Sequence, residues 1–178
     1  LAAVEAVPAD QIVILPNNKN IIPVAEQVDA HTDRTVRVVG TRGIAEGFAA
    51  LMGYDPEAPA DDNAKEMTAL SANVLAGEVT RAVRDSTSDA GPIHEGDYLG
   101  IARDSIKAVE PTVAEAACRL LFVNVTATTE IVTVIEGDGA TAADTRAITE
   151  WLSEHRPGVS PEVHHGGQPL YPYLFGVE

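Results

Sequence analysis

Over the first 60 residues, short apolar runs alternate with segments whose apolar residues recur at helical spacing. Residues 11–15 and 35–39 are rich in β-branched side chains and predict two strands. Ile21, Ile22, Ala25 and Val28 recur at helical spacing after the first strand, with Asn20 in the N-cap position. Ile44, Phe48, Leu51 and Met52 form one face of a second predicted helix. Strand and helix alternating through tight loops predicts a parallel βαβα unit.

A Pro-, Ala- and Asp-rich stretch at 55–62 predicts a loop or linker. Asn63 and Glu66 then have the spacing of a capping box, so a connecting helix with Met67, Leu70 and Val74 is expected.

The period changes to two after Gly77. Residues 78–84 predict a strand with Val79, Arg81 and Val83 on one face, and residues 97–102 and 105–109 predict a hairpin around Arg103-Asp104. A second capping box, Thr112 with Glu115, opens a helix. The apolar run 131–135 predicts a strand buried on both faces. A helix through Trp151 and a closing strand at 170–177 complete the order.

The pattern therefore predicts an α/β chain of mixed type, with a βαβα parallel part followed by a mixed-sheet ββαβαβ part. The expected organisation is a lobe at 1–60, a connecting helix at 61–76 and a mixed α/β lobe at 77–178, forming one structural unit.

Charge narrows the class of partner. Twelve Lys and Arg against 27 Asp and Glu give a net charge of −15. Such a field repels phosphate backbones and anionic membrane surfaces, so we expect no nucleic-acid partner and no membrane insertion. A solvated acidic surface explains the charge, and a basic partner is the alternative.

The remaining composition bears on compartment and completeness. The single Cys118 excludes an internal disulfide and fits a reducing compartment, so a cytoplasmic location is expected. The chain starts at Leu1 in what reads as the middle of a helix. We therefore expect a fragment of a longer protein.

The most polar turn of the first lobe is Asn17-Asn18-Lys19-Asn20. It lies at the carboxyl end of a predicted strand and before a helix, where parallel sheets bind ligands. Helix N–H groups together with Lys19 would suit an anion. The alternative is local turn chemistry, because Asn side chains favour turns and caps.

The second candidate site is the corner His165-Gly166-Gly167-Gln168 with Tyr171 and Tyr173. Two glycines allow another chain or a ligand to approach the backbone closely, although a plain turn gives the same pattern. Tyr171, Tyr173 and Phe175 alternate and share one strand face, which is more typical of a core. Pro172 cannot donate to a sheet ladder, so an edge strand is expected.

Arg81 and Arg84 complete the candidate partner- or ligand-binding residues, either as an interprotein charge cluster or as a solvated face. The histidines and Cys118 lack metal-ligand spacing, and no nucleophile–base arrangement is visible, so we assign no metal ligand and no catalytic residue.

Four runs together resemble a known family. They are Ile12-Val13-Ile14-Leu15-Pro16-Asn17-Asn18-Lys19-Asn20-Ile21, Gly77-Glu78-Val79-Thr80 with Ala82-Val83-Arg84-Asp85, Gly96-Asp97-Tyr98-Leu99-Gly100-Ile101, and His165-Gly166-Gly167-Gln168-Pro169-Leu170-Tyr171-Pro172-Tyr173. They resemble the C-terminal domain of fatty acid kinase catalytic proteins, the Dak-phosphatase or dihydroxyacetone-kinase-like family, over nearly the whole chain.

The resemblance implies a DegV-like two-lobed fold and a modular kinase. In the family an N-terminal DhaL-type domain binds ATP and magnesium, and a fatty-acid-binding carrier of DegV type presents the acyl carboxylate for phosphorylation. It implies no cofactor in this fragment and no catalysis by the fragment alone, and it leaves a homodimer of the full-length protein open.

Two functions follow as expectations. The first is a docking domain that recognises the acyl-carrying protein, with the Asn17–Asn20 turn and the Gly166–Gln168 corner near one another. The second is a fatty-acid or small-anion binding module of DegV type. A stand-alone hydrolase or kinase is the least supported, because nucleophile, metal set and phosphate loop are all missing from the sequence.

Overall fold

A computed structural model describes all of residues 1–178, and the chain divides into two compact units, Leu1–Val74 and Leu75–Glu178. The first unit contains the predicted βαβα part together with the helix expected to connect the lobes. Each unit has its own sheet and its own buried core.

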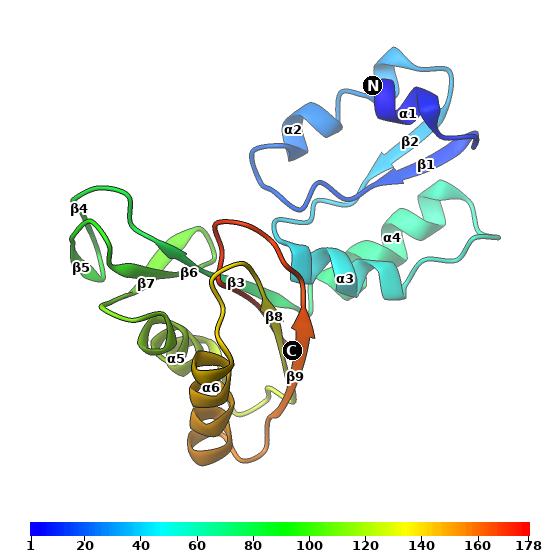
Figure 1. Cartoon of the computed structure of the whole chain (residues 1–178). Helices are drawn as coiled ribbons and strands as arrows, with labels where there is room; N and C mark the ends of the chain where they lie inside the picture. Colours follow the sequence, from blue (N-terminus) through cyan, green and yellow to red (C-terminus); the bar gives the residue numbers. More distant parts are fainter. The chain divides into compact units, whose positions relative to one another are not determined.

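The first unit is built on two parallel strands, β1 (Gln11–Ile14) and β2 (Thr35–Val38), paired from Gln11↔Thr35 to Ile14↔Val38. Its other elements, in chain order, are α1 (Ala2–Ala6), α2 (Ile22–Ala25), the 3-10 turn η1 (Asp29–His31), α3 (Ile44–Met52) and α4 (Ala60–Ser71). Helices α3 and α4 pack against each other, and α4 also contacts both strands (Figure 1).

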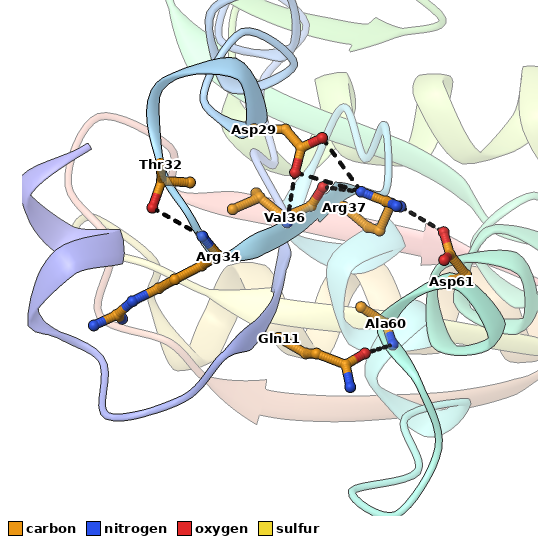
Figure 2. Close-up of polar contacts among 8 residues, drawn as sticks. All are labelled: Gln11, Asp29, Thr32, Arg34, Val36, Arg37, Ala60 and Asp61. Atoms are coloured by element: carbon orange, nitrogen blue, oxygen red, sulfur yellow. Dashed lines mark hydrogen bonds and ion pairs between the residues drawn. The ribbon is translucent and has the colours of Figure 1, made fainter.

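Polar side chains tie the small sheet to its surroundings (Figure 2). The Arg37 guanidinium lies 3.4 Å from Asp29 of η1 and 2.5 Å from Asp61 of α4, and these carboxylates raise the pKa of Arg37. The Gln11 side chain accepts the Ala60 N–H at 2.7 Å, which satisfies a first-turn donor of α4. The ties therefore link β1 and β2 to the helix that packs on them.

Two predicted helix starts in this unit are wrong. Helix α2 has four residues, begins after Ile21 and has no side-chain cap, so Asn20 is not its N-cap. Helix α4 begins after Pro59, which places Asn63 inside the helix. Asn63 is buried, and its amide is satisfied by the loop before the helix: it accepts from Asp55 N and donates to the carbonyls of Asp55 and Ala58.

The predicted apolar face of α3 does not form the core. Phe48 is 56% exposed and Met52 is 84% exposed, while the helix buries Ala45, Gly47 and Ala50. Ala50 lies in one buried cluster with Met67 of α4, and Gly47 lies against Asn17, while the large side chains stay exposed.

The second unit is one six-stranded sheet of order β7-β6-β3-β10-β8-β9, antiparallel except for the β8/β9 pair. Its strands are β3 (Leu75–Arg81), β6 (Tyr98–Ala102), β7 (Ser105–Glu110), β8 (Ile131–Glu136), β9 (Ser160–His165) and β10 (Tyr173–Val177). A small separate hairpin, β4 (Ser86–Ser88) and β5 (Gly91–Ile93), interrupts the chain between β3 and β6.

Helices α5 (Val113–Asn124) and α6 (Ala142–His155) contact each other and cover the sheet (Figure 1). Thr112 is confirmed as the N-cap of α5, since its hydroxyl oxygen accepts the Glu115 N–H at 3.3 Å, and the Glu115 carboxylate accepts from the Thr112 hydroxyl at 2.6 Å. A second cap of this kind, Thr141 with Asp144, opens α6. The apolar stripes of both helices enter one core with Tyr173 and Phe175.

Two strand predictions in this unit meet different outcomes. The β6–β7 hairpin around Arg103-Asp104 is confirmed, and both turn residues have positive φ, as a tight two-residue turn requires. Strand β3 ends at Arg81 rather than at 84, so Val83 lies in the following turn and is 84% exposed.

The predicted edge strand is instead central: β10 pairs with β3 on one side and β8 on the other, and all five of its residues are buried. Pro172 lies just before the strand, so its missing N–H removes nothing from the ladder.

Candidate functional site

The corner between β9 and β10 is fixed by the turn after β8. Gly166 and Gly167 both donate their N–H to the Glu136 carbonyl, at 2.8 and 2.9 Å. Asp138 N donates to the Gln168 carbonyl at 2.8 Å, and Gly137 N donates to the Pro172 carbonyl at 2.9 Å. Four backbone bonds therefore hold this corner against the rest of the sheet.

Gln168 acts as an internal clamp in this corner. Its half-buried amide donates to the carbonyls of Ile135 and Tyr171, each at 3.2 Å. A β-carbon at Gly166 would come closer than 3.0 Å to both Gln168 Oε1 and Ile135 Cγ2, so the open side of that glycine is filled from within the chain. The pair Gly166 and Gln168 thus explains the corner structurally.

Leu170 and Tyr171 interact with residues of strand β3. Thr80 donates its hydroxyl to the Leu170 carbonyl at 3.0 Å. The nearby negative charge of Glu78, aided by burial, raises the pKa of the half-buried Tyr171 hydroxyl. The corner therefore comes together with the middle of β3, a long-range contact that the motif spacing did not suggest.

Tyr173 lies in the core of the second unit. Its ring is fully buried, its hydroxyl lies 2.8 Å from Thr145 Oγ1, and it donates to the Thr141 carbonyl at 3.2 Å. Burial raises the pKa of this hydroxyl. Its ring stacks on Phe175 at 6.1 Å between centroids, which is a packing arrangement. His165, by contrast, is exposed at the end of β9.

Arg81 and Arg84 flank a turn at the end of β3. Arg81 Nε donates to the Gly96 carbonyl at 3.2 Å, and the turn is closed by bonds from Ala82 N to Asp97 O and from Gly96 N to Ala82 O. Arg84 is exposed. Arg81 therefore has a structural contact, whereas Arg84 extends the exposed surface of Val83.

The amide turn of the first unit has two kinds of residue. Asn18 Oδ1 accepts the Asn20 N–H at 2.9 Å, which is local turn chemistry, and Lys19 and Asn20 are exposed. Asn17 has φ 52° and donates its N–H to the buried Thr41 hydroxyl at 3.1 Å. Its Oδ1 is buried against Gly47 without a hydrogen-bond partner.

The predicted site residues therefore fall in both units. Residues 165–171 come together with one another and with Thr80, while Asn17 to Asn20 belong to the first unit. Proximity of the two groups stays a prediction.

Sequence reasoning missed Thr80, Gly137 and Leu170 as parts of the corner. Thr80 and Leu170 belong to runs that carry the family resemblance, but nothing local places them, or Gly137, in the corner, because their contacts join segments distant in sequence.

Other chemistry is sparse. Burial raises the pKa of the Cys118 thiol to about 11, with Glu115 adding to the shift, so the thiol is protonated at neutral pH. No three His, Cys, Asp or Glu side chains converge as a metal site would require. The structure also has no helix of sufficient length and apolarity to span a bilayer.

A pocket of about 430 Å³ lies in the first unit, beside Glu5, His31 and Arg34. It adjoins the site where the Arg34 guanidinium donates to the carbonyls of Val4, Glu5 and Val7 at the end of α1. This guanidinium thus has a structural role.

Solved structures share this fold. A DegV family protein from Corynebacterium glutamicum, Cg2579, aligns with a TM-score of 0.65 at 16% identity, over 99% of this chain and 77% of that chain. The dihydroxyacetone kinase of C. freundii aligns with a TM-score of 0.62 at 16% identity, over 99% of this chain and 40% of that chain. The Streptococcus pneumoniae fatty acid kinase B3 protein loaded with linoleic acid aligns with a TM-score of 0.60 at 13% identity, over 99% of this chain and 74% of that chain. The fold is thus the mixed α/β fold of DegV proteins.

The family follows from the sequence match. Residues 1–178 match the family of FakA-like fatty acid kinase C-terminal domains, and the chain belongs to it. An uncharacterized protein of Staphylococcus aureus (strain USA300) is 36% identical over 175 residues, 98% of this chain and 32% of that protein, and one from strain MRSA252 matches to the same extent. The chain spans about a third of the length of these relatives.

Proposed function

We propose that this chain is the docking domain of a fatty acid kinase. It would recognise a fatty-acid-binding protein of DegV type and hold the acyl carboxylate for phosphorylation by an ATP- and magnesium-binding domain elsewhere in the full-length protein. The observation that carries the proposal is the match of the whole chain to the family of FakA-like C-terminal domains.

The chemistry of the described residues supports a role in binding rather than in catalysis. The one thiol has a pKa of about 11, and the candidate corner uses its polar groups on its own backbone. Positioning two reactants contributes to catalysis without a reacting group from the domain itself. We place this role in the cytoplasm, where acyl carriers and ATP are available.

A second candidate function is a fatty-acid-binding module. The observation favouring it is that the solved proteins sharing this fold include one loaded with linoleic acid and one with heptadecanoic acid. At 13% and 9% identity these likenesses extend to the fold, so lipid binding by this chain needs its own measurement.

The test is calorimetric titration of the chain with an oleate-loaded DegV-type protein from the same organism, with free oleate as a parallel titrant. Heat from the loaded protein but not from free oleate supports docking. Heat from free oleate supports the lipid-binding module. Heat from neither overturns both functions for this chain.

Arg84 provides a charge variant for the same titration. It is exposed and lies beside the exposed Val83, so Arg84→Ala should leave folding intact. If Arg84 contacts an acidic group of the partner, its removal should weaken binding by about two- to fivefold at low salt. Arg103→Ala, in the β6–β7 turn, is the matched control.

A further inference from the structure

Four non-glycine residues of this chain have positive φ: Asn17, Arg103, Asp104 and Leu170. Asn tolerates the left-handed region, and Arg103-Asp104 is the two-residue turn of a hairpin, which requires it. Leu170, with φ 70°, has neither explanation. A bulky aliphatic residue is strained in this conformation.

The strained residue also presents its side chain to solvent. Leu170 is 79% exposed, whereas Tyr173 and Phe175, three and five residues later, are buried. Single exposed leucines are ordinary on protein surfaces. A leucine that is both exposed and strained at positive φ is unusual, because neither local folding nor core packing gains from a leucine at this position.

The conformation is held by contacts from strand β3, from the turn after β8 and from the loop itself. Thr80 of β3 bonds the Leu170 carbonyl at 3.0 Å, and Gln168 bonds the next carbonyl, that of Tyr171, at 3.2 Å. Gly137, directly after β8, bonds the carbonyl of Pro172 at 2.9 Å. Three successive carbonyls are therefore held, and the Leu170 side chain is presented from a rigid base.

We propose that Leu170 is the apolar anchor by which this domain contacts the fatty-acid-binding protein, inserting into an apolar pocket on the partner. The inference rests on the proposed docking function and assigns its contact residue. The backbone carbonyls around Leu170 are already bonded, so the side chain offers apolar contact alone. A preorganised apolar side chain that fills a partner pocket is how a few residues come to dominate an interface. A membrane is the weaker occupant, because a chain of net charge −15 is repelled by anionic lipid.

The test combines binding and stability for the same variants of the 178-residue chain. Leu170→Gly and Leu170→Asn remove the anchor and suit a positive φ, so both should bind the oleate-loaded DegV-type protein about tenfold or more weakly. Relief of strain should leave the melting temperature of Leu170→Asn unchanged or raise it by roughly 2–4 °C. Leu170→Met keeps an apolar anchor and should bind within about threefold of wild type. Met52→Ala, at an equally prominent apolar residue of α3, is the control.

The outcomes separate this inference from the function on which it rests. Weaker binding by Leu170→Asn, with intact stability and normal binding by Met52→Ala, supports the anchor. Unchanged binding by Leu170→Asn overturns the anchor and leaves the docking function standing. A lower melting temperature for Leu170→Asn overturns the strain argument. Failure of wild type to bind the loaded protein overturns the docking function and the anchor with it.

Discussion

Gly137 shows how a single residue determines the candidate corner. A β-carbon there would come closer than 3.0 Å to the carbonyl oxygens of Tyr171 and Gln168. Both oxygens belong to backbone that is already hydrogen-bonded, so neither can move aside without breaking bonds. The glycine is needed because another part of the chain approaches it.

We therefore expect Gly137→Ala to lower the free energy of unfolding by about 2–4 kcal/mol, as overpacking against backbone does. Urea denaturation of the two proteins measures the difference. Gly158→Ala is the matched control, because nothing lies within 4 Å of the β-carbon that it would add. Equal stability of both variants would mean that the corner is looser than its contacts indicate.

Cys118 gives a pH-dependent prediction at the same scale. Burial and Glu115 raise the thiol pKa to about 11, so the reactive thiolate is scarce below that pH. Alkylation by iodoacetamide should be slow at about pH 8 and should reach half of its maximal rate at about pH 11. Half-maximal reactivity near about pH 8.5, as for an unperturbed cysteine, would contradict the burial argument.

Helix boundaries illustrate the scale of the element. Thr112 and Thr141 cap their helices through contacts three residues away, which a sequence pattern contains. Asn63 has the same pattern with Glu66, yet it bonds Asp55 and Ala58 from inside α4. The same spacing therefore marks a helix cap at Thr112, whereas at Asn63 it lies inside a helix whose preceding loop folds back onto the side chain.

Asn63→Ala should consequently destabilise the chain by about 2–3 kcal/mol, since it removes three hydrogen bonds that the buried Asn63 amide makes to Asp55 and Ala58. Thr141→Ala, which removes an exposed cap, should lower stability by about 1 kcal/mol. Chemical denaturation of both variants gives the comparison. A smaller loss of stability for Asn63→Ala than for Thr141→Ala would contradict the role given to the Asn63 hydrogen bonds.

The whole chain has two unequal cores. In the second unit, sixteen buried residues from strands β3, β6, β8 and β10, helices α5 and α6 and their connections form one cluster, whereas the cluster of the first unit contains Val39, Ala50 and Met67. Stability from apolar burial grows with the size of such a core. The second unit therefore has the greater capacity to fold alone.

A fragment of residues 75–178 should accordingly unfold in a single cooperative transition, and a fragment of residues 1–74 should be marginal or unfolded. Circular dichroism melts and dispersion of amide resonances test both. A folded 1–74 fragment beside an unfolded 75–178 fragment would reverse this ranking of the cores.

The sequence by itself determined the parallel start, the hairpin at Arg103-Asp104, the Thr112 cap and the buried run at 131–135, because each depends on periodicity or on contacts a few residues apart. Family membership was also contained in its motifs. Tertiary structure alone decided that β10 lies at the centre of the sheet, that the large side chains of α3 are exposed, and that Leu170 is held at positive φ. These features depend on partners outside the local sequence, such as Leu75 for Val177, Met67 for Ala50 and Thr80 for Leu170, and local propensity contains no information about them.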